Sequence, residues 1–484
     1  MNLRQKVANG VVWSAIQRWG REIISFLILV VLSRLLDPEA FGLVALALVF
    51  TAFAQIFLDQ GFSAAIVQRA NLERGHLDTA FWISVLTGTL LTAVGIAASG
   101  WVAAFFQEPR LGPVLSWLSI SFIFSALSST QIAILQRAFA FKSLAARSMT
   151  AKTVGGIVGV SLAFNGFGVW SLVAQRLAAG LAGVIILWRS SAWRPGFNVS
   201  IKHFTELFTF GASILGTNIF QVFVRRSNDC LIGYFLGTTL LGYYTIGYRF
   251  LLVITRLVTG VTNAVAFPAF SRLQHNPQRM RRAFYSVTQY TSLLAFPVFL
   301  GLAVLAPQLI PAVFGDKWAP SIPVMQVLAL MGILQTVLVF NGSVMKASGK
   351  PSWQLGITLL NALGSVIGFF LAVRWGIVAV AYSFVIVGYL LAPISCVAVR
   401  RQIHIDFRTY LGHFVAPLAA SLIMVAAIAA VKLSIEHHAL NPYMQLSIYF
   451  MAGVLTYLTV IVLTARSLSR EVLDLVRLAL LSWK

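Results

Sequence analysis

Apolar stretches, each long enough to form a membrane-spanning helix, recur along the whole chain and are separated by short polar segments. About 20 such residues cross the hydrocarbon core of a bilayer, because a helix rises 1.5 Å per residue. The pattern predicts about fourteen spans, near residues 10–35, 41–67, 79–104, 111–136, 145–165, 168–188, 207–236, 239–272, 283–306, 319–345, 352–373, 377–399, 409–431 and 443–465. An amphipathic cytoplasmic tail is predicted at 467–484.

Composition supports this prediction. Of the 484 residues, 58% are hydrophobic and only 10% are charged, which leaves too little charge for the surface of a soluble domain of this size. The apolar runs are also too continuous for the alternating strands of an outer-membrane barrel. We therefore predict an all-α polytopic membrane protein.

The distribution of basic residues predicts the orientation. The net charge is +22, which in a soluble protein would suggest nucleic-acid binding. Here 23 of the 36 Lys and Arg residues fall on alternate connections, beginning with the N-terminus, and five fall on the opposite set. This asymmetry predicts that both termini are cytoplasmic. The basic charge should then meet anionic lipids of the inner leaflet, and nucleic acid is not expected as a partner.

The first twelve spans resemble two copies of six. Leu36 and Gly42 align with Leu236 and Gly242 at an offset of 200 residues. Copies with an even number of spans share one orientation, so they should pack about an axis along the membrane normal with a central cavity between them. We predict four parts: six-helix bundles at 1–200 and 201–405, two additional transmembrane helices at 406–466, and the tail at 467–484.

The remaining eight basic residues lie inside predicted spans, where the only acidic residues at similar depth are Glu22, Asp59 and Asp229. A cation in hydrocarbon costs about 2.5–3.5 kcal/mol, so such residues usually face a polar cavity or a partner. The excess of basic residues predicts a wet interior that receives an anion. The eight are Arg18, Arg21, Lys152, Arg176, Arg225, Arg226, Arg249 and Arg256.

Two interpretations of these cations stay open: they line a cavity, or they join helices through buried ion pairs. Lys152, near a cytoplasmic edge, is expected to snorkel, and Arg176 fits either interpretation. Neighbours on a helix point about 100° apart, so only one of Arg225 and Arg226 should face a given cavity. The candidate substrate-binding residues are Arg18, Arg21, Arg225, Arg226, Arg249 and Arg256.

The three acidic residues are candidates for coupling transport to a proton or sodium gradient. Glu22 and Asp229 are also suited to pair with a neighbouring arginine, and Asp59 is also suited to cap a helix end beside Gly61. No cofactor or metal is expected, because the seven histidines lie in or near loops without metal-ligand spacing. Catalytic residues are not expected either.

The sharpest local motif runs from Arg34 to Gly42, with the sequence RLLDPEAFG. Asp37, Pro38 and Glu39 suit the start of a helix. The alternative, an acidic catalytic pair of a glycosyltransferase, would need a longer loop. The stretches DQGF at 59–62, FPAFSR at 267–272 and ASGK at 347–350 follow in order.

Together these motifs resemble the polysaccharide transporter family of Wzx-type flippases, in the multidrug/oligosaccharidyl-lipid/polysaccharide (MOP) exporter superfamily. The resemblance is strongest to its exopolysaccharide and lipopolysaccharide branch, and it covers essentially the whole chain. It implies export of an undecaprenyl-diphosphate-linked oligosaccharide across the bacterial inner membrane by alternating access. It also implies a cationic cavity lined by the first, second, seventh and eighth spans.

Rival functions stay open at this point. One is a membrane enzyme of polysaccharide assembly, a polymerase or ligase, which usually needs a larger outer loop than this chain has. Another is a different exporter of the superfamily, such as a flippase for peptidoglycan precursors. An exporter of cationic drugs would be expected to have an acidic cavity. Polymerase and export machinery are expected as further partners.

Overall fold

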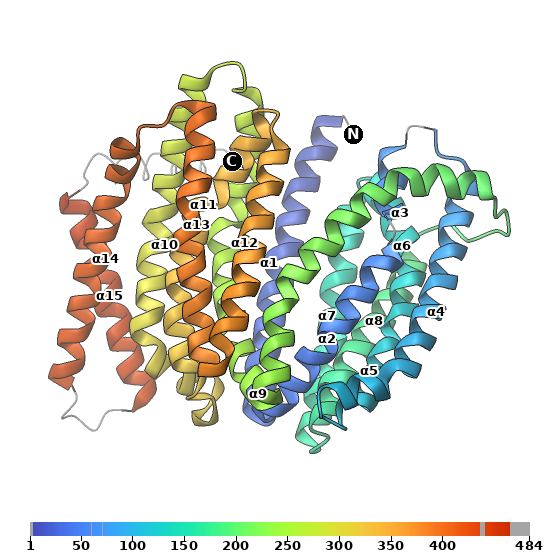
Figure 1. Cartoon of the computed structure of the whole chain (residues 1–484), viewed down its shortest axis with the longest axis horizontal. Helices are drawn as coiled ribbons and strands as arrows, with labels where there is room; N and C mark the ends of the chain where they lie inside the picture. The colour runs from blue at the N-terminus through green and yellow to red at the C-terminus, as the bar shows by residue number, and fades with distance from the viewer. Residues whose placement is uncertain (1–2, 60, 70, 436–440, 465–484) are drawn as a thin grey trace. The chain divides into compact units, whose positions relative to one another are not determined.

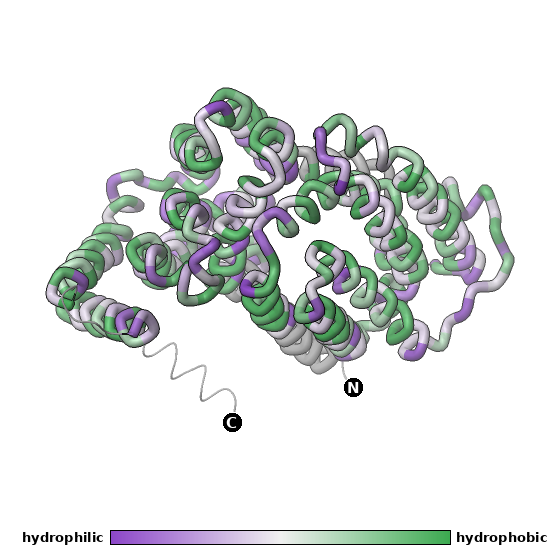
Figure 2. The backbone as a smooth tube through the Cα atoms, turned by 90° about the horizontal axis from the view of Figure 1, so that it is seen from below, coloured by the Kyte–Doolittle hydropathy of each residue, from purple (hydrophilic) through white to green (hydrophobic). Residues whose placement is uncertain are grey.

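A computed structural model describes residues 3–59, 61–69, 71–435 and 441–464. The side chains of residues 3–18, 59, 210–221, 223–225 and 261–265 are outside this description, as is the predicted tail at 467–484. The described residues form helices and connections without any strand, which confirms the all-α prediction (Figure 1). Figure 2 shows hydrophobic residues over most of the helical backbone, with hydrophilic residues largely at turns and connections.

The structure divides into two compact units, residues 1–245 and 246–484. The helices that begin in the first unit are α1 (Leu3–Leu35), α2 (Pro38–Asp59), α3 (Phe62–Gln68), α4 (Arg74–Phe105), α5 (Leu111–Ser119), α6 (Ser121–Arg137), α7 (Phe141–Phe164), α8 (Val169–Ser190) and α9 (Ile201–Arg272). As the motif predicts, α2 begins at Pro38, and Glu39 in its first turn forms an ion pair with Arg110.

Two glycines interrupt helices of this unit. Gly61 separates α2 from α3 with a φ of 73°, and Gly237 lies at φ 83° within α9. A positive φ is easily adopted only by glycine, so both breaks are encoded locally. The break at Gly237 divides α9 near the boundary between the predicted spans 207–236 and 239–272.

Small residues bring α7 and α8 together. A Cβ at Gly155 would lie 2.5 Å from the carbonyl oxygen of Gln175, and one at Gly159 would lie 2.7 Å from the Gln175 Cβ. No larger side chain fits between these backbones without displacement. This close approach is typical of helix packing in membranes.

The second unit contains the later part of α9 and the helices α10 (Pro277–Phe314), α11 (Ser321–Ala347), α12 (Pro351–Ala372), α13 (Ile377–Ile403), α14 (Phe407–Ile435) and α15 (Pro442–Thr464). Its two short 3-10 helices are η1 (Asp316–Trp318) and η2 (Val373–Trp375). Helix α14 packs between α10 and α15 through a core that includes Met424 and Ile428. The hydroxyl of Tyr457 on α15 donates to the Leu293 carbonyl on α10 at 2.7 Å.

Eleven helices of the described residues are long and apolar enough to cross a membrane. Each of the fourteen predicted spans is helical in the structure. Three of them, at 10–35, 145–165 and 207–236, do not correspond to any of the eleven helices that are apolar enough to cross a membrane. These three spans hold five of the eight intramembrane cations, which lower their mean hydropathy. The count of fourteen therefore stays a prediction.

The boundary between the compact units lies 45 residues beyond the predicted end of the first bundle, because the turn around Gly237 packs on the turn between α1 and α2. A Cβ on Gly42 would overlap the carbonyl oxygen of Thr238, and a Cβ on Gly242 would overlap that of Pro38. Residues 238–242 therefore belong with the first unit. The division of the chain into four parts stays a prediction.

Candidate functional site: a cationic cavity in the first unit

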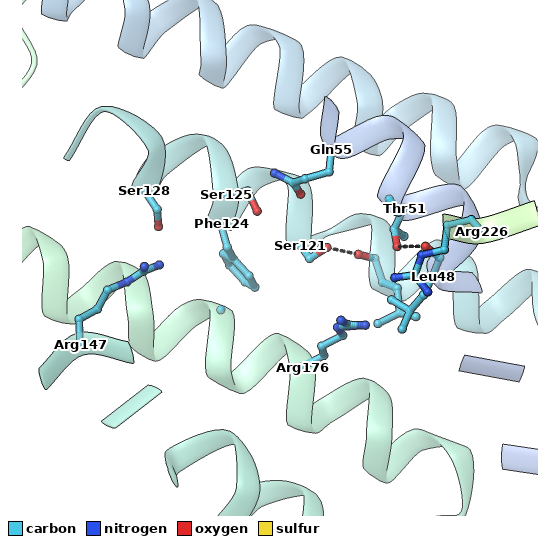
Figure 3. Close-up of a pocket in the computed structure, with 13 residues that line it drawn as sticks. Leu48, Thr51, Gln55, Ser121, Phe124, Ser125, Ser128, Arg147, Arg176 and Arg226 are labelled. Carbon is cyan, nitrogen blue, oxygen red and sulfur yellow. Dashed lines mark hydrogen bonds between the residues drawn. The ribbon is translucent and has the colours of Figure 1, made fainter. Parts of the chain in front are cut away.

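A cavity of about 300 Å³ lies among helices of the first unit (Figure 3). Its polar lining comes from five helices, and its apolar lining includes Leu48 and Phe124. The polar residues are Thr51 and Gln55 on α2, Ser121, Ser125 and Ser128 on α6, Arg147 on α7, Arg176 on α8 and Arg226 on α9. The cavity thus combines three cations with hydroxyl and amide groups.

The serines share one face of α6. Ser121, Ser125 and Ser128 are spaced by four and three residues, which places them above one another on a helix. Ser121 donates to the Leu118 carbonyl at 2.6 Å. Thr51 and Gln55 are likewise four residues apart on α2, so two helices each present a polar strip to the same space.

Arg147 lies at one end of the cavity in Figure 3, on the side of Ser128. Its Nε donates to the carbonyl of Gly183 at 3.4 Å. A Cβ on Gly183 would lie 3.2 Å from a terminal nitrogen of Arg147, so the glycine allows the guanidinium to pack on the α8 backbone. Among the described residues, Arg147 has no acidic ion-pair partner within 4.0 Å.

Arg226 and Arg176 lie near each other at the opposite end, beside Leu48 and Thr51 (Figure 3). Arg226 forms an ion pair with Asp229, one helical turn further along α9, at 3.0 Å. Because the Arg226 side chain is still one-third exposed, this pairing does not remove it from the cavity lining. Arg226 therefore both pairs with an acidic residue and lines the cavity.

The structure places the predicted site residues unevenly. Of the six candidate arginines, Arg226 lines this cavity, and Arg21 lies 3.8 Å from Glu22 on α1. Arg249 and Arg256 are exposed on the part of α9 that belongs to the second unit. The side chains of Arg18, Arg225 and Asp59 lie outside the described residues. Arg176 joins the cavity, and Lys152 is exposed.

Sequence reasoning missed Arg147 and the serines. Arg147 lies at the edge of the predicted span 145–165 and was counted with the basic residues of the preceding connection, so it was not among the eight candidate cations, whereas the structure places it inside α7. The spacing of the three serines is a signal that could have been recognised. The spacing indicates a binding site only once the structure shows that this face of α6 and three arginines line the same cavity.

Arginines and hydroxyl groups suit a ligand that carries both phosphate and sugar. A guanidinium donates paired hydrogen bonds to phosphate oxygens and stays charged at any physiological pH. Serine, threonine and glutamine exchange hydrogen bonds with sugar hydroxyls. The cavity therefore has the chemistry to replace the water around a polar, anionic headgroup.

Comparison with known proteins identifies the family. The family model described as "Polysaccharide biosynthesis protein" matches residues 31–323, which is more than half of the chain. The chain belongs to this family. The match spans the cavity helices from α2 to the first part of α9 and continues into the second unit.

Relatives with biosynthesis names match most of the chain. Teichuronic acid biosynthesis protein TuaB of Bacillus subtilis (strain 168) is 27% identical over 95% of this chain and 96% of its own length. Succinoglycan biosynthesis transport protein ExoT of Rhizobium meliloti (strain 1021) is 29% identical over 97% of this chain and 96% of its own length. Lipopolysaccharide biosynthesis protein WzxC of Escherichia coli (strain K12) is 26% identical over 77% of this chain and 79% of its own length.

Solved structures show the fold. The lipid II flippase MurJ, in an inward closed conformation, aligns with a TM-score of 0.78 and 14% identity, over 95% of this chain and 99% of its own. An inward-facing multidrug resistance MATE transporter of the MOP superfamily aligns with a TM-score of 0.64 and 15% identity, over 82% of this chain and 98% of its own. The chain therefore has the fold of these two transporters, and its apolar helices of membrane-spanning length make it a multi-pass membrane protein.

Proposed function

We propose that this chain is a flippase that moves a lipid-linked oligosaccharide across the bacterial cytoplasmic membrane. The observation that carries the proposal is the cavity lined by Arg147, Arg176 and Arg226 together with serine, threonine and glutamine side chains. Membership of the polysaccharide biosynthesis family supports the same conclusion, as do relatives named as a transport protein and as a probable flippase.

The substrate we propose is an oligosaccharide on undecaprenyl diphosphate, destined for exopolysaccharide or lipopolysaccharide. Its diphosphate is anionic and cannot cross hydrocarbon unaided. The arginines would hold phosphate oxygens, and the strips on α2 and α6 would bind sugar hydroxyls. The polyprenyl chain would stay in the lipid. Access to the cavity alternates between the two sides of the membrane, so headgroup and sugars need never meet hydrocarbon.

A transporter fits this chain better than the rival membrane polymerase or ligase. The connections between α4 and α5 and between α7 and α8 run only from 106 to 110 and from 165 to 168. These are too short to form a separate catalytic domain on the side predicted to be outside. A cavity lined by cations that can hold phosphate favours binding and release over the general acid–base chemistry of carboxylates or histidine.

Coupling to an ion gradient is a further part of the proposal. Glu22 and Asp229 each lie within 4.0 Å of an arginine, so protonating either carboxyl would release that arginine for a phosphate. Asp59 stays a third candidate from its sequence position. Charge-neutral variants such as Glu22→Gln should then change the dependence of transport on a proton gradient.

Reconstitution tests the proposal directly. Purified protein would be placed in vesicles that contain an undecaprenyl-diphosphate oligosaccharide, and a glycosidase added outside would report the glycan that reaches the outer leaflet. We expect faster exposure of the glycan than in protein-free vesicles, with loss of this gain in an Arg147→Gln, Arg226→Gln double variant. Equal exposure with and without protein, across several oligosaccharides, would argue against a flippase.

A further inference from the structure

Two histidines and two glutamates from separate segments meet on the side of the first unit that the basic residues place in the cytoplasm. Glu73 and His76 lie at the start of α4, and His203 and Glu206 lie in the first two turns of α9. Figure 1 shows the beginning of α9 passing close to the beginning of α4. The centres of the His76 and His203 rings are 4.1 Å apart.

We propose that Glu73, His76 and His203 bind a divalent transition-metal ion of the zinc type. One ligand atom of each residue lies within 4.8 Å of the other two. Imidazole nitrogen and carboxylate oxygen are ligands that Zn²⁺ accepts at about 2.0–2.2 Å, which puts the ligand atoms of a tetrahedral site about 3.3 Å apart. Glu73 Oε2 and His203 Nε2 are already 3.8 Å apart.

The side chains have the freedom to close this gap. The Glu73 side chain is 71% exposed, so its carboxylate can move toward an ion without displacing the core. His203 is mostly buried, and its Nδ1 has no hydrogen-bond partner among the described residues. A ring that is held in place but incompletely hydrogen-bonded loses little when one of its nitrogens takes a metal.

His76 must change its hydrogen bonds to join the site. Its Nδ1 accepts from the backbone N–H of Glu73 at 3.2 Å, so Nε2 carries the proton that it donates to Glu206 at 2.9 Å. Metal binding at Nδ1 leaves the proton on Nε2, with its bond to Glu206, and gives up only the bond from the Glu73 N–H. Metal binding therefore removes one neutral hydrogen bond and forms three metal–ligand bonds.

Glu206 supplies negative charge beside the ion. Its Oε2 accepts from Arg69 at 2.7 Å and lies 4.0 Å from His203 Nδ1. The hydrogen bond from His76 and the charge of Arg69 lower the pKa of Glu206, so its carboxylate is ionised at neutral pH. Such hydrogen-bonded carboxylates next to the ligands commonly orient and strengthen a metal site.

A metal here would fasten the connection that precedes α9. That connection is already held on α4, because Asp78 accepts from the Gly196 N–H at 3.0 Å and Trp82 donates to the Gly196 carbonyl at 2.7 Å. A bound ion would add a further attachment, from His203 to Glu73 and His76. The site lies outside the cavity, so metal binding is separate from substrate binding.

Titration of the purified, metal-stripped full chain with Zn²⁺ tests the site. We expect one zinc ion per chain by elemental analysis and calorimetry. His203→Gln should abolish the high-affinity step, and Glu206→Gln should weaken it about 10- to 100-fold. The matched control is His275→Gln, because His275 is exposed outside the cluster, and it should bind zinc like the wild type.

A second measurement does not depend on any variant folding. Co²⁺ bound to the wild type should show the intense visible absorption of a tetrahedral site, and added Zn²⁺ should remove it. Substoichiometric zinc in the wild type, or equal affinity in His203→Gln and His275→Gln, would overturn the proposal. No substrate is present in these measurements, so they stand or fall independently of the transport proposal.

Discussion

Gly42 and Gly242 occupy equivalent positions in a reciprocal contact. Gly42 lies against the carbonyl of Thr238, and Gly242 lies against the carbonyl of Pro38. Both pairs are related by the offset of 200 residues that connects the two predicted sequence copies. The contact therefore uses the same surface twice, as in a two-fold symmetric interface. Beside it, Thr238 donates to Glu108 at 3.4 Å, and Glu108 pairs with Arg110 at 3.2 Å.

This contact predicts that Gly42→Ala and Gly242→Ala are each strongly harmful. A Cβ at either position overlaps backbone atoms, which cannot move aside as a flexible side chain can. Overpacking of this kind costs about 1–3 kcal/mol, and the two segments should separate instead of tolerating the methyl group. Thermal unfolding of the purified variants, followed by tryptophan fluorescence, measures the loss.

Gly100→Ala is the matched control. Gly100 lies in α4, and no atom lies within 4 Å of the place that a Cβ on it would take. Alanine there should therefore be neutral or stabilise the protein by up to about 1 kcal/mol through its helix propensity. If Gly42→Ala and Gly100→Ala had the same melting temperature, the tight crossing at Gly42 would be wrong.

Arg147 should contribute to substrate affinity. Removing a charge-assisted hydrogen bond to phosphate costs about 1.5–3 kcal/mol, so Arg147→Gln should raise the apparent KM about 10- to 150-fold. Arg147→Lys should be intermediate, because lysine keeps the charge but not the paired donors. Initial flipping rates at several substrate concentrations measure this. Lys142→Gln, an exposed change in the first turns of α7, should leave KM unchanged. A similar KM for both glutamine variants would remove Arg147 from the site.

Arg226 and Asp229 allow the two interpretations of the intramembrane cations to be separated. Either single neutralisation should destabilise the protein by about 1–3 kcal/mol, and the double variant should recover part of that loss. Transport should respond differently. Arg226→Gln should weaken substrate binding, whereas Asp229→Asn should not, because it leaves the cavity more positive. Equal loss of affinity in both single variants would assign the pair a purely structural role.

Much of the fold could be predicted from the sequence, because apolar runs of bilayer length leave few alternatives. The start of α2 at Pro38 and the break near Gly237 follow from local chemistry, since proline suits a first turn and glycine accepts a positive φ. The three predicted spans without a counterpart among the eleven apolar helices are also those with Arg18, Arg21, Lys152, Arg225 and Arg226.

The site was less predictable, since a position in a span does not determine the direction of a side chain. Arg176 and Arg226 were both recognised as cations inside predicted spans, but only the packing of α2, α6, α7, α8 and α9 brings them to one cavity. The cluster around His203 was invisible because His76 and His203 are 127 residues apart in the sequence and approach only after folding.

Glu206 should give stability a dependence on acid pH. The hydrogen bond from His76, and then the charge of Arg69, hold the pKa of Glu206 below its ordinary value of 4.5. The folded state therefore binds this proton less readily than the unfolded state does. The stabilisation is present above pH 4.5 and is lost as the pH falls through the lower, folded-state pKa. In metal-free buffer, wild-type melting temperature should therefore fall more steeply below this pH than that of Glu206→Gln, which lacks the carboxylate. Parallel curves for the two proteins would show that Glu206 gains nothing from His76 and Arg69 on folding.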